Sequence, residues 1–234
     1  MSTATAGMDI EKARHNMIEQ QIRTWEVLDQ SVLDLLAVVK RENFVPQAFR
    51  LLAFVDMEIP LKVDLSDGSV YDSGEAMFAP KMEARFLQEL AIRPHERVLE
   101  IGTGSGYMAA LAGHKAQHVI SIEIDERLRH FGAANLARAG VRNVHVEVGD
   151  GSRGWSARAP YDVIIVSGSL PVLPPELLAQ LKVGGRLAAV VGSPPVMTAQ
   201  IVTRVSDAGY ETLNIFETRI KALRNAWQPS TFRF

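Results

Sequence analysis

Cysteine is absent from all 234 residues of the chain. Its absence excludes disulfide bonds, thiolate zinc sites, iron–sulfur clusters and cysteine nucleophiles together. A chain without cysteine fits the reducing conditions of the cytoplasm, and we expect the protein to be cytoplasmic.

The sequence also has no marked excess of charge of one sign and no long apolar run. It contains 25 Lys and Arg against 27 Asp and Glu, which gives a formal net charge of −2. This balance favours neither nucleic acid nor an anionic membrane as a partner. No segment approaches the roughly 20 apolar residues of a membrane helix, and the N-terminal residues MSTATAGMDIEK do not resemble a secretion signal. We therefore expect a soluble protein that is not exported.

The composition is that of a globular protein, with 47% apolar and 22% charged residues. The sequence has no internal repeat and no low-complexity linker. We expect a single domain over residues 1–234 in three parts, namely 9–90, 91–191 and 192–234. Nothing in the composition predicts the oligomeric state.

The central part alternates short β-rich runs with helical patterns. Helical patterns lie near 106–116, 125–139 and 174–181. The β-rich runs are RVLEIG (97–102), HVISIE (118–123), NVHVEV (143–148), YDVIIVS (161–167) and GRLAAVV (185–191). Strands that alternate with helices in segments this short predict an α/β fold, with a mostly parallel sheet and helices on both faces.

The two flanking parts follow other patterns. Apolar residues at helical spacing, with Asp29 as the expected N-cap of a second helix, predict an N-terminal helical extension. The segment 62–74 is rich in Asp, Ser and Gly and predicts a loop or short hairpin, after which Pro80 opens a helix. Near the C-terminus, β-rich runs at 197–206 and 211–218 predict an antiparallel hairpin that closes the sheet edge.

The segment VLEIGTGSGY contains the most informative motif of the chain, a buried strand followed by Gly102, Gly104 and Gly106. Glycine lets the backbone turn sharply and approach a ligand closely. A dinucleotide fingerprint needs its third small residue at position 107, where Tyr107 stands. The GxGxG spacing, with Glu100 two residues before the first glycine, instead matches the first motif of class I methyltransferases that use S-adenosylmethionine.

Two carboxylates follow the next strands. Glu123 ends the second run, 21 residues after Gly102, where a carboxylate can accept hydrogen bonds from ribose hydroxyls. Asp150 follows the third run in the sequence Gly-Asp-Gly, at the sheet edge where such folds bind ligands, and would lie beside the adenine. Each of them alone could also serve as a cap of the next helix or turn. The glycine turn and both carboxylates in register favour the cofactor site.

Other chemistry receives little support. His114 and His118 are four residues apart, but the sequence has no third ligand beside them, and we predict no metal site. Ser105 lies in GTGSGY, which is not the GxSxG pattern of a hydrolase. No side chain near the glycine turn is a persuasive general base, and the sequence identifies no catalytic residue.

With these motifs, most of the chain resembles the protein-L-isoaspartate O-methyltransferase family. KRENFVP (40–46) precedes the glycine turn, and Gly-Asp-Gly (149–151) and QLKVGGRL (180–187) follow it. The resemblance implies a Rossmann-like class I methyltransferase fold, with 9–90 as helical cap and substrate loop and 91–191 as cofactor-binding core. It implies S-adenosyl-L-methionine as cofactor, S-adenosyl-L-homocysteine as product, and L-isoaspartyl residues of damaged proteins as methyl acceptors. The cofactor-binding residues that it implies are Glu100, Gly102, Thr103, Gly104, Ser105, Gly106, Glu123, Asp150 and Gly151.

One segment departs from the family pattern. Where the family carries Ser-x-Pro before the glycine turn, with a serine implicated in handling the substrate carboxylate, this chain has Phe78, Ala79 and Pro80. Phenylalanine has no hydroxyl, and the nearby Ser73 and Lys81 are candidates for the missing donor. Three readings follow, namely isoaspartyl methylation, methylation of another protein or small-molecule acceptor, or a cofactor-binding scaffold without turnover.

Overall fold

The computed structural model describes residues 9–228, and its centre is a parallel sheet. Five strands pair in parallel in the order β5-β4-β3-β6-β7. Their bounds are β3 (Arg97–Ile101), β4 (His118–Glu123), β5 (Val144–Val148), β6 (Tyr161–Leu170) and β7 (Leu181–Ser193). The predicted α/β fold with a mostly parallel sheet is therefore confirmed, and β3 is central because it pairs with both β4 and β6.

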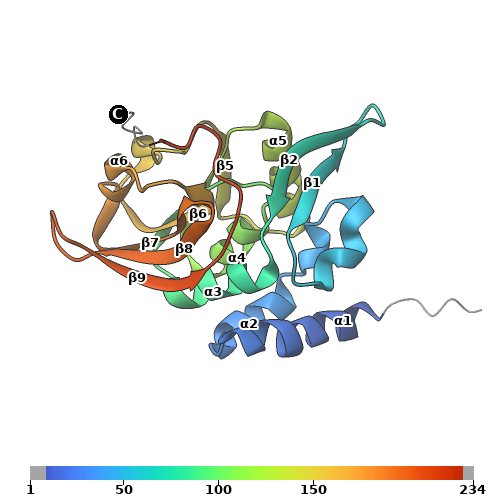
Figure 1. Cartoon of the computed structure of the whole chain (residues 1–234). Coiled ribbons are helices and arrows are strands. Elements are labelled where there is room, and N and C mark those ends of the chain that lie inside the picture. The colour runs from blue at the N-terminus through green and yellow to red at the C-terminus, as the bar shows by residue number, and fades with distance from the viewer. Residues whose placement is uncertain (1–8, 229–234) are drawn as a thin grey trace, which may run out of the picture.

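The hairpin predicted near the C-terminus closes one edge of this sheet. It consists of β8 (Val196–Arg204) and β9 (Tyr210–Glu217), and both strands pair antiparallel to their neighbours. In Figure 1 the orange and red end of the chain continues from this hairpin and crosses toward the hairpin of β1 (Ile59–Asp64) and β2 (Val70–Met77). The last described residues thus lie close to strands that are distant in sequence.

Apolar residues cover both faces of the sheet because the central strands are buried on both sides. On one face, Val98 and Val163 join a large cluster with α3 (Pro80–Leu90), α4 (Tyr107–Lys115) and α5 (Glu126–Arg138). On the other face, Leu99 and Ile164 join a smaller cluster with Leu177, under the short segments η5 (Ser156–Arg158) and α6 (Pro175–Leu178). The long helices therefore cover the first face and short turns the second.

One predicted helix is corrected by the structure. The pattern at 174–181 predicts two turns, but α6 ends at Leu178 and β7 begins at Leu181. The backbone carbonyl of Gln180 accepts a hydrogen bond from the N–H of Tyr161 at 2.8 Å, so residues after Ala179 join the sheet. His114 lies in α4, and His118 begins β4 in the run predicted as a strand.

The N-terminal part packs helical segments and a hairpin against this core. Asp29 caps the second helix as predicted, because its carboxylate accepts the Ser31 N–H at 2.8 Å. The segment at 62–74 belongs to a hairpin that is longer than predicted, β1 (Ile59–Asp64) with β2 (Val70–Met77). The helical segments are α1 (Ile10–Asn16), η1 (Met17–Ile22), η2 (Arg23–Trp25), α2 (Gln30–Val38), η3 (Arg41–Asn43) and η4 (Gln47–Phe54).

The strand order reverses direction at β3, since the chain runs from β3 through β4 to β5 and then returns to β6 on the other side. Open α/β sheets bind ligands at the carboxyl ends of the strands at such a reversal. Figure 1 shows the β1–β2 hairpin standing beside these strand ends. Within residues 9–228, no helix has the length and apolar character needed to cross a membrane.

Candidate active site

A pocket opens at the carboxyl ends of β3, β4 and β6, and half of the twelve predicted site residues line it. Six of the predicted residues line it, namely Phe78, Gly102, Gly104, Glu123, Asp150 and Gly151. Ser167 at the end of β6 and Glu58 and Glu75 from the β1–β2 region complete much of the wall. The other six predicted residues do not line this pocket.

The glycine turn has a backbone shape that other residues rarely adopt. Gly102 has φ of +96°, and a Cβ there would lie 3.0 Å from the carbonyl oxygen of Ser167. Gly106 has φ of +82°, and a Cβ there would lie 2.9 Å from the carbonyl oxygen of Gly132. Gly102 therefore keeps the pocket floor open, whereas Gly106 serves helix packing and does not line the pocket.

Glu123 binds the backbone of the glycine turn and can accept further hydrogen bonds from a ligand. Its carboxylate accepts the N–H of Gly104 at 2.9 Å and the N–H of Asp125 at 3.0 Å, each on a different oxygen. Burial raises the pKa of Glu123, while these two N–H groups act in the opposite direction. Because each carboxylate oxygen has two lone pairs, Glu123 can still accept hydroxyl donors from the pocket.

Asp150 is a second carboxylate that lines the pocket. One oxygen accepts the N–H of Ser152 at 2.9 Å, and the other accepts the side-chain amide of Asn225 at 3.0 Å. Burial opposes ionisation, but these hydrogen bonds outweigh it and lower the pKa of Asp150. A Cβ on Gly151 would lie 2.7 Å from Ile101, so this glycine lets the loop lie against β3.

Glu100, Thr103 and Ser105 line a second, smaller cavity behind the glycine turn. Glu100 is fully buried and accepts hydroxyl hydrogen bonds from Ser121 and Ser167. Burial raises the pKa of Glu100 to about 8. These residues support the turn from behind, and Glu100 in particular lines only the rear cavity.

Phe78 lies between the two cavities and lines both of them. Its ring packs edge-on against Phe86 with 6.4 Å between centroids, and its backbone carbonyl accepts a hydrogen bond from Arg41 at 2.7 Å. Ala79 and Pro80 form the start of α3 and line neither cavity. The aromatic side chain thus forms an apolar wall at the position where the family carries a serine.

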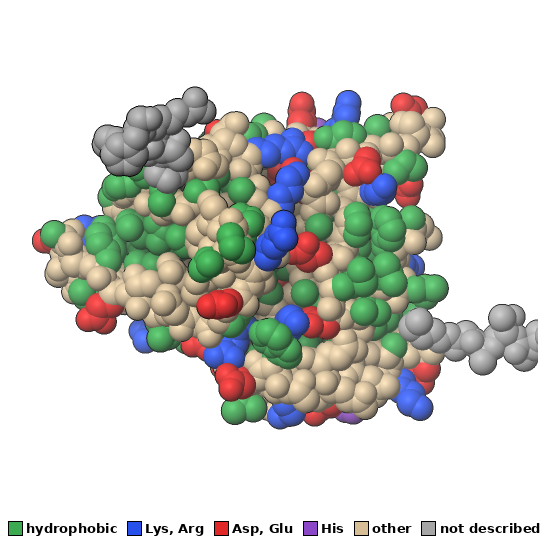
Figure 2. All heavy atoms as spheres, in the orientation of Figure 1, with side chains coloured by type: hydrophobic (Ala, Val, Ile, Leu, Met, Phe, Trp, Pro, Cys, Tyr) green, Lys and Arg blue, Asp and Glu red, His purple; other side chains and the backbone are tan. Residues whose placement is uncertain are grey.

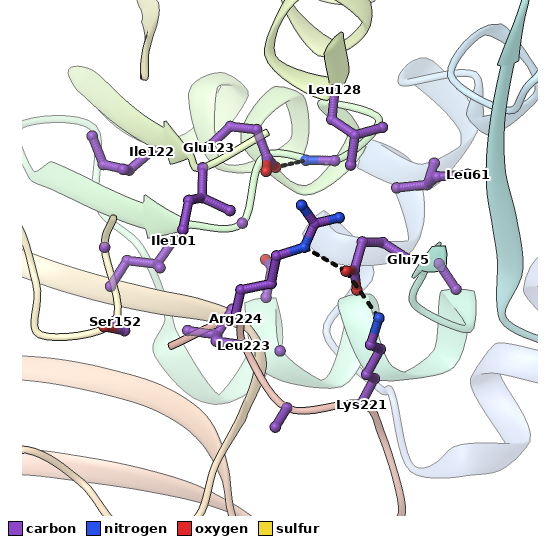
Figure 3. A pocket seen from close by; sticks show the side chains of 18 of the residues that line it. Leu61, Glu75, Ile101, Ile122, Glu123, Leu128, Ser152, Lys221, Leu223 and Arg224 are labelled. Atoms are coloured by element: carbon purple, nitrogen blue, oxygen red, sulfur yellow. Dashed lines mark hydrogen bonds and ion pairs between the residues drawn. The ribbon is translucent and has the colours of Figure 1, made fainter. Parts of the chain in front are cut away.

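Sequence reasoning missed the segment after β9. Its backbone pairs with the end of β6, because Ser169 donates to the carbonyl of Lys221 at 3.0 Å and accepts from Leu223 at 2.9 Å. Lys221 and Arg224 both donate to the same oxygen of Glu75, at 2.9 Å each (Figure 3). The basic residues in RIKALRN were the only signal, and they have no pattern that predicts a pocket.

Comparisons with known proteins agree with this geometry. The family model described as protein-L-isoaspartate(D-aspartate) O-methyltransferase matches residues 12–219. A protein-L-isoaspartate O-methyltransferase of Protochlamydia amoebophila is 38% identical over 220 residues, which cover 92% of this chain and 99% of that protein. The chain belongs to the protein-L-isoaspartate O-methyltransferase family. A second family member, from Rhodopseudomonas palustris, is 37% identical over 91% of this chain and 94% of its own length.

Solved structures of the isoaspartate O-methyltransferase family share the fold. One has a TM-score of 0.73 at 25% identity and covers 92% of this chain, which spans 65% of that longer chain. A Plasmodium falciparum structure, a putative family member in complex with S-adenosyl-L-homocysteine, has a TM-score of 0.73 at 19% identity and covers 90% of this chain and 98% of its own. The family match ends at Arg219, so Lys221 and Arg224 lie outside it.

Proposed function

We propose that this protein transfers a methyl group from S-adenosyl-L-methionine to the carboxylate of L-isoaspartyl residues in damaged proteins. The observation that carries the proposal is the pocket, which in a member of this family brings Gly102, Glu123 and Asp150 together at the carboxyl ends of three parallel strands. The partners are therefore proteins or peptides that contain isoaspartyl residues. S-Adenosyl-L-homocysteine is the product of the cofactor.

The residues present fit this cofactor. Glu123 has lone pairs free for ribose hydroxyls, and the glycine turn leaves space that a Cβ would fill. Asp150 and Gly151 line the same pocket, and we assign them to the adenine. When bound, S-adenosylmethionine supplies a methyl group on a positively charged sulfur.

The chain does not need a general base for this acceptor. A carboxylate with an ordinary pKa near 4 is already ionised at pH 7. What remains for the protein is alignment of the acceptor and exclusion of water from it, which can supply up to about 7 to 11 kcal/mol in favourable cases. Phe78 and Leu61, which are buried in the pocket wall, supply the apolar surface for such exclusion.

A second function is favoured by one observation, the apolar side chain at position 78. A wall without a hydroxyl also suits a methyltransferase for another protein or small-molecule acceptor. A scaffold that binds the cofactor without turnover is the third possibility. All three functions use the same cofactor pocket. They differ only in whether an acceptor is methylated and in which acceptor it is.

An assay with two matched peptides separates these functions. A peptide with one L-isoaspartyl residue and its twin with a normal aspartyl residue are incubated with labelled S-adenosylmethionine, and methyl ester is measured. We expect ester only on the isoaspartyl peptide. Binding of S-adenosyl-L-homocysteine without ester on either peptide would favour another acceptor or a scaffold. Absence of cofactor binding would contradict the assignment of the pocket.

A further inference from the structure

The cofactor pocket continues into a second groove. This groove lies beside the ends of β6 and β7, and its wall includes Pro171, Pro194 and Met197. Glu58, Ile220, Lys221 and Ala222 line both the pocket and the groove. A substrate that enters along the groove therefore passes these residues before it reaches the glycine turn.

Two cations line the pocket among the residues that the structure describes, and they are placed differently. Arg224 donates to Glu75, to Asp125 at 3.1 Å and to the carbonyl of Ser73 at 3.0 Å, and it does not line the groove. Lys221 donates to Glu75 and to the carbonyl of Gly74, both at 2.9 Å. An ammonium group has three N–H donors, so Lys221 keeps one donor for a ligand.

Other candidate donors near Phe78 are already engaged. The hydroxyl of Ser73 donates to the carbonyl of Leu61 at 2.8 Å. Lys81 pairs with Asp56 at 2.8 Å and its ammonium lies 3.9 Å from the ring centroid of Trp25. Neither Ser73 nor Lys81 lines the pocket or the groove. The structure therefore gives no support to either residue as the donor that replaces a serine hydroxyl.

We infer that Lys221 binds the carboxylate of the methyl acceptor at the junction of the pocket and the groove. This inference rests on the proposed function, since it assumes a carboxylate acceptor. Glu75 does not lose its counter-charge when Lys221 turns to the substrate, because Arg224 still donates to the same oxygen. Glu58 lines the same junction, and where it is ionised a cation beside it offsets its repulsion of the acceptor carboxylate.

The position of Lys221 suits this role. Its side chain is 60% exposed, so it can move without breaking the core. Figure 2 shows the molecule in the orientation of Figure 1. Lys and Arg side chains form a row down the middle of the visible face, with acidic side chains beside them. In Figure 3 Glu75 lies between Lys221 and Arg224.

The test compares the binding of two peptides to the wild-type protein and to two variants at Lys221. One peptide carries an L-isoaspartyl residue, and the other carries the same residue with its free carboxylate converted to a primary amide. Their dissociation constants are measured by calorimetry in the presence of S-adenosyl-L-homocysteine. The wild-type protein should bind the carboxylate peptide about ten- to a hundredfold more tightly. Lys221→Met should remove this preference, and Lys221→Arg should keep most of it.

Controls separate the possible failures. Lys62→Met removes a lysine that pairs with Asp72 on the β1–β2 hairpin and lines neither cavity, so the preference should persist. Lys221→Met should bind S-adenosyl-L-homocysteine as the wild-type protein does, and a large loss of this affinity would assign Lys221 to the cofactor and overturn the inference. Undiminished preference in Lys221→Met would overturn the inference and leave the proposed function intact. A wild-type protein that binds the carboxylate and amide peptides equally would contradict both the inference and the proposed function.

Discussion

Glu123 is the residue whose contacts make the most direct prediction about the cofactor. Replacing it with alanine removes the acceptor for ribose hydroxyls and also frees the N–H groups of Gly104 and Asp125. We expect Glu123→Ala to weaken S-adenosyl-L-homocysteine binding by about 1.5 to 3 kcal/mol, as for hydrogen bonds to a charged group. Calorimetry measures this change, and an unaltered dissociation constant would remove Glu123 from the binding site.

Glu100 predicts a dependence of stability on pH. Its pKa is raised by burial to about 8, so the folded protein holds a proton that the unfolded chain, with a pKa near 4.3, releases. The stability that comes from this proton is fully present below about pH 4.3 and is lost progressively as the pH rises to about 8. Glu100→Gln keeps the neutral form at every pH. The variant should therefore gain stability relative to the wild-type protein between pH 5 and pH 9.

Denaturant unfolding at several pH values measures this difference for Glu100→Gln. The slope for one proton is at most about 1.4 kcal/mol per pH unit. Glu83, a second buried carboxyl whose pKa burial raises to about 8, is present in both proteins. A difference in stability that stays constant with pH would show that Glu100 is already ionised in the folded protein.

Phe78 predicts a loss of stability without a gain in activity. Its side chain is buried and packs against Phe86, so Phe78→Ser leaves a cavity and should cost about 3 to 5 kcal/mol, the range for removing a large core side chain. Since Lys221 supplies the charge for the acceptor, we expect no rise in kcat/KM for the isoaspartyl peptide. A tenfold rise in kcat/KM would show that a hydroxyl at this position is needed.

At the scale of elements, the segment after β9 fastens three parts of the molecule across the pocket. Arg224 reaches β2 through Glu75 and the start of α5 through Asp125, while Asn225 reaches the loop after β5 through Asp150. This segment therefore forms one wall of the pocket. The hairpin β1–β2 is the surface against which it is held.

Arg224→Met should loosen this segment. The amide of Leu223, which donates to Ser169, should exchange its hydrogen faster, and S-adenosyl-L-homocysteine should dissociate faster. Hydrogen exchange and stopped-flow dissociation measure the two effects. Arg153→Met is the matched control, because Arg153 pairs with Glu176 on an exposed surface outside the pocket. Equal exchange at Leu223 in Arg224→Met and wild type would contradict the role of the Arg224 contacts.

At the scale of the whole molecule, we propose that the chain folds as one domain. One apolar cluster contains Met17 from the N-terminal helices, Val98 and Val163 from the sheet, and Ile220 from the segment after β9. A core shared in this way couples the three parts. We therefore expect the N-terminal cap (9–90) to unfold together with the rest of the chain.

This coupling predicts a single thermal unfolding transition. S-Adenosyl-L-homocysteine at a hundred times its dissociation constant should stabilise the folded protein by about 2.7 kcal/mol, which corresponds to a rise in Tm of roughly 5 to 10 °C. Differential scanning calorimetry with and without the ligand measures both. Two separate transitions, with only one moved by the ligand, would show that the cap folds independently.

Local patterns in the sequence determined the sheet and the cofactor end of the site. The run at 118–123 is the observed β4, and Pro80 opens α3 as predicted. Gly102, Glu123 and Asp150 could be placed together because each follows a strand, and parallel strands bring their carboxyl ends to one edge. The patterns that predicted these features span only a few residues, or they involve residues that directly follow a strand.

Only the tertiary structure decided the acceptor end of the site. Glu75 meets Lys221 and Arg224 across 146 and 149 residues of chain, and no local pattern encodes a contact between side chains so far apart. The end of α6 also depends on a distant contact, because the carbonyl of Gln180 accepts a hydrogen bond from the N–H of Tyr161 in β6. Hydrophobic period and turn chemistry act over a few residues, whereas the pocket wall depends on which distant segments the common core brings side by side.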